Sequence, residues 1–232
     1  MPPPYQIDYS RLFNVLDVIK ESSKEQMVDV NYVEQLICQV GLHNDPAVSA
    51  NYGEKYQKYL TDHGMLQQPK QFAEALVYLS DKKIRSYVEV GTFNGMATGF
   101  IFGYFTKFNP RFVGMTIDIT ERYNPNYARE MMKRFEIYFI TEDSNNIKGD
   151  QNDLCFIDGD HNYKQVKADY ENIGHKAKYC MFHDICDSFQ KKVNDGGSLK
   201  YWEELKLGTK FTEFTYNPTD VKYFGIGIID QT

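Results

Sequence analysis

Residues 87–95 constrain the fold more than any other part of the chain. They read as a short apolar strand, then a turn that contains Gly91, and then a helix that we expect to start near Met96. A glycine in such a turn lets the backbone approach a ligand, and a helix start offers free N–H groups. Neither register around Gly91 supplies the G-x-G-x-x-G fingerprint of dinucleotide-binding folds. The pattern is E-x-G-x-x-x-G, from Glu89 to Gly95, and it predicts a nucleotide-cofactor site of a different kind.

From residue 86 onward, short β-type runs alternate with segments of helix length. The runs cover residues 86–90, 111–117, 137–140, 153–157, 179–183, 210–216 and 222–229. Such alternation is typical of a parallel sheet with crossover helices. The last two runs are separated by only a few residues around Asn217 and Pro218, which permits an antiparallel hairpin. We therefore predict an α/β, Rossmann-like fold whose seven-stranded sheet is mostly parallel, with an antiparallel end strand. Ligands of such sheets bind at the carboxyl ends of the strands.

The first third of the chain has helical periodicity instead. Apolar residues recur at i, i+3, i+4 and i+7 between Leu12 and Ile19, which predicts an amphipathic helix. Asn31 and Glu34 have the spacing of an N-terminal capping pair ahead of a second apolar stripe, and Gly41 is suited to end that helix.

We divide the chain into a helical cap, residues 1–66, and a main domain, residues 67–232. The simplest role of the cap is to pack onto the main domain for stability. A lid over a site and a dimer surface are the two alternatives.

Charge and composition disfavour several classes of partner. A net charge of -6 and a pI near 5.4 disagree with a phosphate-binding nucleic-acid protein, which usually has a basic face. No apolar run approaches the ~20 residues of a membrane span, and the N-terminus lacks the basic and apolar regions of a signal peptide. The four cysteines show no C-x-x-C spacing, which indicates reduced thiols. We expect a cytoplasmic protein with neither a nucleic-acid nor a membrane partner.

Acidic residues follow the second and third predicted strands. Asp118 ends the second strand, where a carboxylate is able to accept two hydrogen bonds from a ribose diol. The third strand is followed by Thr141-Glu142-Asp143-Ser144. Each acid also has a simpler interpretation as a helix N-cap or a solvated loop residue.

The densest group of chemically active residues follows the fourth predicted strand. Asp158, Asp160 and His161 stand close together there, and His183 and Asp184 follow the fifth strand. Two carboxylates and an imidazole are costly to gather unless a cation or a proton lies between them. We therefore expect the chemistry of the protein at these strand ends.

Several motifs resemble, in the right order, the macrocin/sugar O-methyltransferase-like group of class I S-adenosylmethionine (SAM) methyltransferases. They are E-x-G-x-x-x-G, FIDGDH-x-Y-x-x-V-x-x-D from Phe156, HDI from His183, a segment at 196–206 similar to G-V-x-x-F-W-x-E-L-K, and GIGI from Gly225. The resemblance covers residues 67–232. It implies the methyltransferase form of the Rossmann-like fold, and SAM as cofactor.

The resemblance also implies which residues bind SAM. An acidic residue lies under the turn, glycines give room for the methionine and ribose parts, and the later acids contact ribose and adenine. On this sequence these residues are Glu89, Gly91, Thr92, Phe93, Gly95, Asp118, Asp143, Ser144 and Asp158. Glu142 stands where the family usually has glycine.

Methyl transfer to a hydroxyl needs an acceptor held in line and a group that takes its proton. The resemblance implies Asp158, His183 and Asp184 as ligands of Mg²⁺ or another divalent metal, and Asp160 as the base. His183 stands where related metal-dependent enzymes carry aspartate, and Mg²⁺ prefers oxygen ligands. A metal-free site with His161 or His183 as the base is the competing interpretation.

The predicted function is SAM-dependent O-methylation of a small-molecule acceptor, which is a sugar, a polyketide or a phenol. Two alternatives stay open: a hydroxylase-like protein of the same fold that uses Fe(II), and a non-catalytic SAM-binding partner subunit. A nucleic-acid amino methyltransferase is disfavoured, because N/D-P-P-Y/F does not follow strand four. Homo-oligomerisation stays open. Trp202 is either a core anchor or a border of the acceptor pocket, and residues 187–198 are a candidate loop over the site.

Overall fold

A seven-stranded sheet organises the computed structural model, which describes residues 7–186, 195–219 and 222–232. The strand order is β5-β4-β3-β6-β7-β9-β8, and among the described strands of this sheet β9 alone runs in the direction opposite to the others. The strands are β3 (Ser86–Val90), β4 (Val113–Asp118), β5 (Glu136–Thr141), β6 (Asn152–Ile157), β7 (Ala177–His183), β8 (Lys210–Phe214) and β9 (Ile226–Asp230).

This sheet confirms the predicted fold class, with a difference at its end. The antiparallel strand is the last in the chain, but it lies between β7 and β8 rather than at the sheet edge. It also begins at Ile226 and not at residue 222. Phe224 and Gly225 have φ angles of 59° and 94°, which extended strand geometry does not allow.

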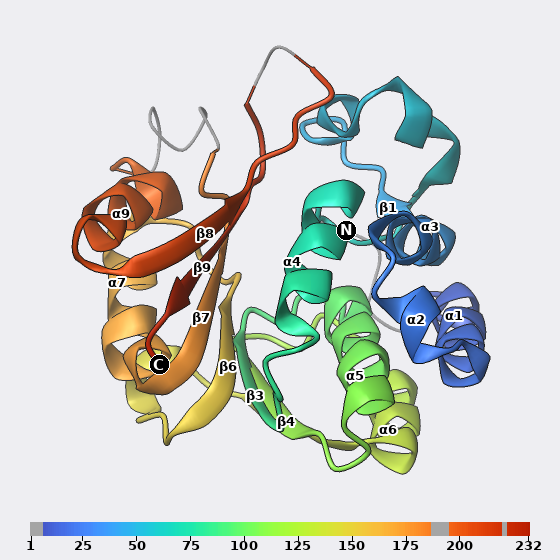
Figure 1. Ribbon diagram of the computed structural model, residues 1–232, viewed down its shortest axis with the longest axis horizontal. Helices are drawn as coiled ribbons and strands as arrows, with labels where there is room; N and C mark the ends of the chain where they lie inside the picture. Colours follow the sequence, from blue (N-terminus) through green and yellow to red (C-terminus); the bar gives the residue numbers. More distant parts are fainter. Residues whose placement is uncertain (1–6, 187–194, 220–221) are drawn as a thin grey trace.

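Helices cover both faces of the sheet (Figure 1). One face carries α4 (Pro69–Leu79), α5 (Met96–Phe108) and α6 (Pro125–Arg134), and the other carries α7 (Tyr163–Asn172) and α9 (Gly197–Leu205). Each face has its own cluster of buried apolar side chains, and the larger cluster lies on the α4 and α5 side.

The N-terminal helices form a further layer outside α4 and α5 (Figure 1). They are α1 (Ser10–Glu21), α2 (Lys24–Met27) and α3 (Val30–Val40). Leu12 and Leu16 of α1 pack against two glycines of α5: a Cβ at Gly99 would lie 2.7 Å from Leu12, and one at Gly103 would lie 2.4 Å from Leu16. Because α5 is covered by the sheet on one side and by α1 on the other, it is apolar on nearly all sides.

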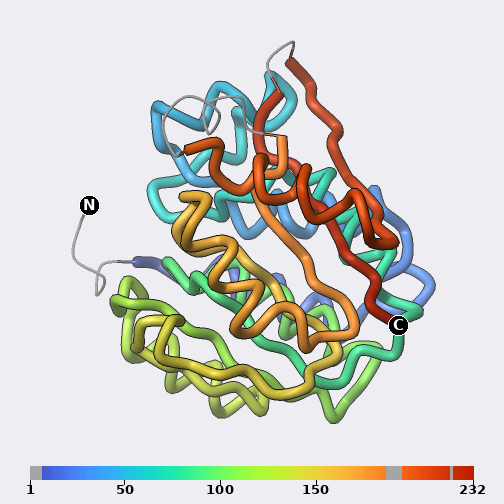
Figure 2. The backbone as a smooth tube through the Cα atoms, turned by 90° about the vertical axis from the view of Figure 1, so that its left-hand side faces the viewer, coloured from blue at the N-terminus to red at the C-terminus, as the bar shows by residue number. Residues whose placement is uncertain are grey.

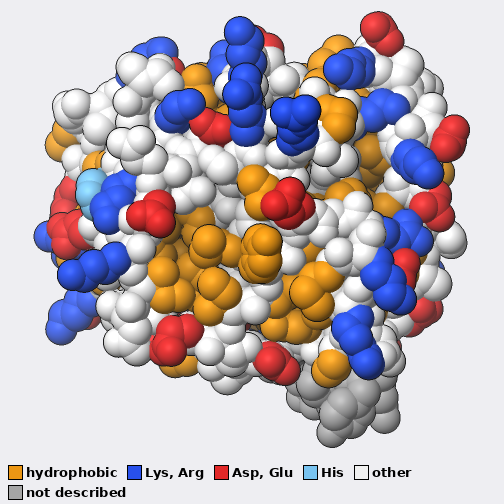
Figure 3. Space-filling model, turned by 90° about the horizontal axis from the view of Figure 1, so that it is seen from below, with side chains coloured by type: hydrophobic (Ala, Val, Ile, Leu, Met, Phe, Trp, Pro, Cys, Tyr) orange, Lys and Arg blue, Asp and Glu red, His pale blue; other side chains and the backbone are white. Residues whose placement is uncertain are grey.

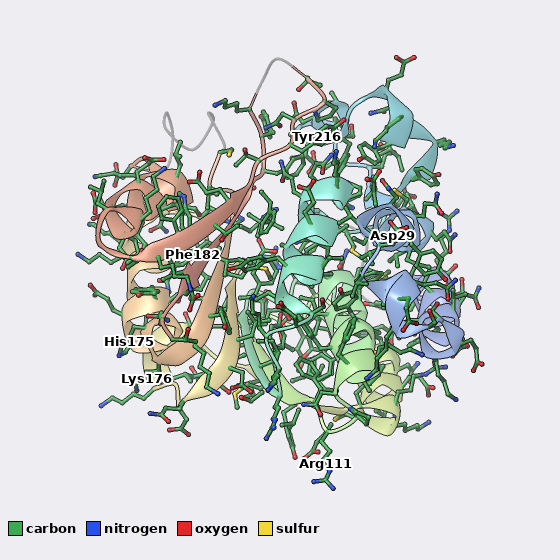
Figure 4. All side chains as sticks on the ribbon, in the orientation of Figure 1. Asp29, Arg111, His175, Lys176, Phe182 and Tyr216 are labelled. Carbon is green, nitrogen blue, oxygen red and sulfur yellow. The ribbon has the colours of Figure 1, made fainter. Side chains whose placement is uncertain are left out.

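The predicted capping pair of Asn31 and Glu34 is wrong. The N-cap of α3 is Asp29, labelled in Figure 4, whose Oδ1 accepts hydrogen bonds from the backbone N–H of Asn31 at 2.8 Å and of Tyr32 at 3.4 Å. Glu34 instead accepts a hydrogen bond from Lys55 at 2.8 Å. The predicted end of the helix at Gly41, where φ is 106°, is confirmed.

Residues 42–66 contain short elements: a parallel pair of β1 (Leu42–His43) and β2 (Leu60–Thr61), and the 3₁₀ helices η2 (Ser49–Tyr52) and η3 (Glu54–Tyr59). Figures 1 and 2 show this segment beside the described residues between β8 and β9, 215–219 and 222–225. Tyr52 stacks on Phe224 there, with ring centroids 5.2 Å apart. Residues on both sides of position 66 belong to one hydrophobic cluster, and the division into two domains there stays a prediction.

The connection between β5 and β6, whose residues are all described, contains the 3₁₀ helix η4 (Ser144–Asn146) and no α-helix. The other short 3₁₀ helices near the sheet are η5 (Gly174–Lys176) and η6 (Lys206–Gly208).

Tyr138 of β5 is 55% exposed, and hydrophobic side chains gather in the middle of the face that Figure 3 shows from below. Among the described residues, no helix has the length and apolar character needed to cross a membrane.

Candidate active site at the carboxyl edge of the sheet

A cleft of about 760 Å³ follows the carboxyl ends of β3, β4, β5, β6 and β7. Its walls also include Ala47, Val48 and residues 65–67 from the N-terminal side, and Tyr223 and Phe224 ahead of β9. The volume is in the range that small-molecule and cofactor sites occupy. The cleft therefore lies where open α/β sheets bind ligands.

The glycine turn after β3 forms part of the cleft wall. Gly91 has a φ of 100°, and a Cβ there would lie 2.1 Å from the backbone oxygen of Asp158. Its N–H donates to the carbonyl of Ile117 at 2.8 Å. The turn is thus packed tightly against β4 and β6, and only glycine fits at this position. Gly95, with a φ of 79°, is the N-cap of α5.

Glu89 and Thr92 support this turn. Glu89 is 1% exposed and accepts a 2.6 Å hydrogen bond from the hydroxyl of Thr98. Burial raises the pKa of Glu89 to about 8, so its carboxyl is mostly protonated at neutral pH. The hydroxyl of Thr92 lies 2.5 Å from that of Thr116. Glu89 thus lies under the turn, whereas Thr92 lines the cleft.

The predicted ribose and adenine residues line the same end of the cleft as Phe93. Asp118 accepts hydrogen bonds from the N–H of Phe93 at 2.8 Å and of Thr120 at 3.1 Å. A carboxylate offers about four lone-pair sites, so Asp118 keeps capacity for a ligand. Asp143 caps η4 through a 2.9 Å bond from the N–H of Asn145.

Two further contacts at this end were not predicted. The hydroxyl of Ser144 is turned to Asp169, to which it donates a 2.6 Å hydrogen bond. Arg122 also lines the cleft, with its guanidinium 5.9 Å from the centre of the Phe93 ring.

A cluster of carboxylates and imidazoles occupies the other end of the cleft. Nδ1 of His183 lies 2.8 Å from Oδ1 of Asp158 and 3.4 Å from Oδ1 of Asp184. Nε2 of His161 lies 3.9 Å from Oδ1 of Asp158 and 3.5 Å from Oδ2 of Asp184. The structure thus brings the predicted metal ligands Asp158, His183 and Asp184 together and adds His161 to them.

Asp160 lies apart from this cluster. Its carboxylate is exposed and accepts hydrogen bonds from the backbone N–H of Asn162 at 3.1 Å and from the Asn162 side chain at 2.6 Å. Asn162 is in turn the N-cap of α7. The structure therefore places Asp160 on the rim of the cleft, and its assignment as the base stays a prediction.

Two side-chain contacts of the cluster were not predicted. Gln67 is 3% exposed, and its Nε2 donates a 2.6 Å hydrogen bond to Oδ2 of Asp158. Ser198 is 2% exposed, and its hydroxyl lies 3.4 Å from Nδ1 of His161. Ser198 stands in the motif at 196–206, which gave a signal for this position, whereas no sequence pattern distinguishes Gln67.

Trp202 is a core residue. It is fully buried, its ring centroid is 5.6 Å from that of Phe182, and its Nε1 donates a 2.6 Å hydrogen bond to Glu213. Trp202 is not among the residues that line the described cleft. Of the predicted loop over the site, residues 187–194 lie outside the described residues.

No protein-family model matches the chain, and no curated protein has significant sequence similarity to it. Solved structures do share its fold. An O-methyltransferase from Bacillus cereus in complex with S-adenosylhomocysteine (SAH) matches with a TM-score of 0.53 and 13% identity, over 94% of this chain and 99% of the other. The N-methyltransferase NodS from Bradyrhizobium japonicum, also with SAH, matches with a TM-score of 0.51 and 12% identity, over 70% and 86% of the two chains.

A putative RNA methyltransferase from Pyrococcus horikoshii matches with a TM-score of 0.54 and 7% identity, over 87% of this chain and 97% of the other. The fold of the chain is therefore that of class I SAM-dependent methyltransferases. Since these proteins are named for oxygen, nitrogen and RNA acceptors, the fold alone does not identify the acceptor.

Proposed function

We propose that the protein transfers a methyl group from SAM to a hydroxyl of a small-molecule acceptor. One observation carries the proposal: a single cleft joins the glycine turn and the acids after β4 and β5 to a cluster of two carboxylates and two imidazoles. A sugar, a polyketide and a phenol are the acceptor classes to test.

The end of the cleft near Phe93 fits the nucleoside part of SAM. Asp118 has lone pairs available for the ribose diol, and we assign Asp143 to the adenine amino group. At Gly91 a side chain would fill the space against Asp158, and Asp158 lies between this turn and the imidazoles. Bound SAM supplies an electrophilic methyl group on its sulfonium, and the residues of this chain orient the partners and exclude water.

The cluster at the other end is suited to a hydroxyl acceptor, whose proton must be removed. An imidazole is able to take that proton directly. His161 is the more accessible of the two, with 27% of its side chain exposed against 4% for His183. A divalent cation held by the cluster would instead lower the pKa of the hydroxyl. Asp184 lies 3.5 Å from Nε2 of His161 and 3.4 Å from Nδ1 of His183, near enough to orient either imidazole.

Calorimetry with SAH, with NAD⁺ as the control ligand, tests the cofactor. We expect micromolar SAH binding that disappears in Asp118→Ala. Asp150→Ala is the matched control, because Asp150 is exposed ahead of β6, at the opposite edge of the sheet. Absence of SAH binding to the folded protein would overturn the proposal.

Methyl transfer to an acceptor is tested separately, by measuring SAH released from SAM in the presence of hydroxyl-bearing compounds. SAH release that depends on an acceptor excludes a non-catalytic SAM-binding subunit. SAH binding without release in a broad screen of sugars, polyketides and phenols would favour such a subunit.

A hydroxylase-like function is the second candidate. One carboxylate with two imidazoles is the donor set of non-haem Fe(II) oxygenases. Protein loaded with Fe(II) under anaerobic conditions would then consume O₂ with 2-oxoglutarate. Lack of this turnover in a protein that binds SAH would leave methyl transfer as the function.

A further inference from the structure

We propose that Asp158, His161 and His183 form a binding site for a divalent transition metal ion of the Zn²⁺, Co²⁺ and Fe²⁺ class, in preference to Mg²⁺. The inference deepens the proposed function and rests on it for the role of the ion, because the cluster lies in the cleft assigned to methyl transfer.

The three side chains converge on one point from two neighbouring strands. Asp158 and His161 follow β6, and His183 ends β7. One ligand atom from each, a carboxylate oxygen and two ring nitrogens, all lie within 4.8 Å of one another. Exposed acidic groups often gather without an ion, but here His183 is 3% exposed and the side chain of Asp158 is 12% exposed.

The charges in this small volume favour a cation. Nε2 of His161 and Nδ1 of His183 each face two carboxylates, those of Asp158 and Asp184, at distances of 2.8–3.9 Å. Two carboxylates at such a site repel one another unless positive charge is present. A divalent cation bound among these groups would supply that charge.

Outer contacts orient two of the three ligands. Gln67 donates to Oδ2 of Asp158 at 2.6 Å, which leaves Oδ1 directed at the imidazoles. Ser198 contacts Nδ1 of His161 at 3.4 Å, on the ring nitrogen that does not face the carboxylates. When the Nδ1–H of His161 donates a hydrogen bond to the Ser198 hydroxyl, the lone pair of His161 is on Nε2 and is directed at the cluster. Such partners hold metal ligands in place in protein metal sites.

The donor types select the ion. Two nitrogens and one oxygen suit Zn²⁺, Co²⁺ and Fe²⁺, whereas Mg²⁺ requires oxygen ligands in near-octahedral geometry. The set predicted from sequence, Asp158, His183 and Asp184, has two carboxylates and one imidazole. The addition of His161 therefore shifts the preference away from Mg²⁺.

Metal titration of the tag-free protein, after dialysis against a chelator, tests the inference. We expect one equivalent of Co²⁺ to give the visible absorption of a nitrogen-ligated site, and Zn²⁺ to bind at least about 100-fold more tightly than Mg²⁺ in calorimetry. His161→Ala should lower Zn²⁺ affinity by more than the about 10–100-fold expected for Gln67→Leu, because His161 is a direct ligand.

His175→Ala is the matched control. His175 is an exposed histidine just ahead of β7 (Figure 4), at the opposite edge of the sheet, and its loss should leave Zn²⁺ binding unchanged. His161→Ala is the decisive variant, because His161 is partly exposed and its loss is compatible with folding, which circular dichroism verifies. His183→Ala removes a buried side chain. If this variant folds, a loss of Zn²⁺ affinity in it supports the result for His161→Ala.

Three results would overturn the inference: no Zn²⁺ or Co²⁺ binding by the folded protein, equal affinity for Mg²⁺ and Zn²⁺, or unchanged Zn²⁺ affinity in His161→Ala. SAH calorimetry on the same metal-free protein separates the two proposals. SAH binding without metal binding overturns the metal site alone, and metal binding without SAH binding overturns the proposed methyl transfer alone.

Discussion

The side chain of Gln67 donates a 2.6 Å hydrogen bond to Oδ2 of Asp158, a residue 91 positions further along the chain. Gln67 stands directly ahead of Gln68, the N-cap of α4, and Asp158 follows the last residue of β6. The bond thus connects the beginning of a helix on one face of the sheet to the carboxylate at the centre of the cleft. An amide N–H is only a donor, so Oδ2 of Asp158 is the acceptor in this contact.

Replacement of Gln67 by leucine should lower the free energy of unfolding by about 1–3 kcal/mol, because the carboxylate of Asp158 loses a buried donor. Urea denaturation measures the change. Gln57→Leu is the control, since Gln57 is exposed and its side chain donates to the backbone carbonyls of Ser49 and Gly53, and we expect less than about 0.5 kcal/mol there. An equal decrease in the free energy of unfolding in the two variants would show that the bond to Asp158 does not add to the stability of the protein.

Gly91→Ala should destabilise the protein by about 2–6 kcal/mol and abolish SAH binding. The added Cβ meets the backbone of Asp158 at 2.1 Å, and the φ of 100° is strained for alanine. Gly208→Ala is the matched control, because a Cβ there has nothing within 4 Å. Thermal denaturation and SAH calorimetry compare the two, and wild-type SAH affinity in Gly91→Ala would contradict the role given to the turn.

Glu89 should make stability fall as pH rises. The pKa of Glu89 is raised by burial to about 8, whereas an unfolded glutamate has a pKa of about 4.3. The folded state therefore holds a proton that the unfolded state releases between these values, and stability that is present below about pH 4.3 is lost as pH rises to about 8.

Glu89→Gln should remove this pH dependence. In the wild type, the free energy of unfolding should fall by a few kcal/mol across the range, at about 1.36 kcal/mol per pKa unit. Urea denaturation at pH 5, 7 and 8.5 measures the difference between variant and wild type. Glu54→Gln, at an exposed position, should retain the wild-type pH profile. A Glu89→Gln profile parallel to the wild type would show that Glu89 ionises normally.

Trp202 should report unfolding and not ligand binding. It is the only tryptophan of the chain, it is fully buried, and it lies in the core rather than along the cleft. We expect its fluorescence to be blue-shifted in the folded protein, to shift to the red in urea, and to stay unchanged on saturation with SAH. A saturable change in emission with SAH would place the cofactor closer to α9 than we propose.

The strand pattern was sufficient to predict the sheet, because β-branched and aromatic runs separated by helix-length segments are compatible with few folds other than a parallel sheet with crossover helices. It also predicted the edge at which Asp118, Asp143, Asp158 and His183 meet, since parallel strands end on one side. The sequence did not predict that β9 pairs with both β7 and β8. A hairpin of β8 and β9 has the same local pattern whether β8 or β9 lies next to β7.

Single side chains were harder to predict than their strands. Asp160 and His161 are adjacent in sequence, yet only His161 is directed at the cluster, because Asp160 bonds to the N-cap residue of α7. Asp29 and Asn31 are both suitable N-caps, and their two positions differ only in where the helix begins. Gln67 lies between Leu66 and Gln68, directly ahead of a helix, and its contact depends on a partner that local sequence does not specify.

The contact between Gln67 and Asp158 also restricts the length of the chain ahead of α4. Pro69 fixes the start of that helix, and one inserted residue between positions 67 and 69 would displace Gln67 by about 3.3 Å, more than a hydrogen bond tolerates. Insertions and deletions among homologous chains should therefore avoid these positions and accumulate in exposed connections such as the one at Gly208. A glutamine two positions ahead of the proline that corresponds to Pro69 would then identify relatives that keep the contact with Asp158, even where the sequences of the strands have diverged.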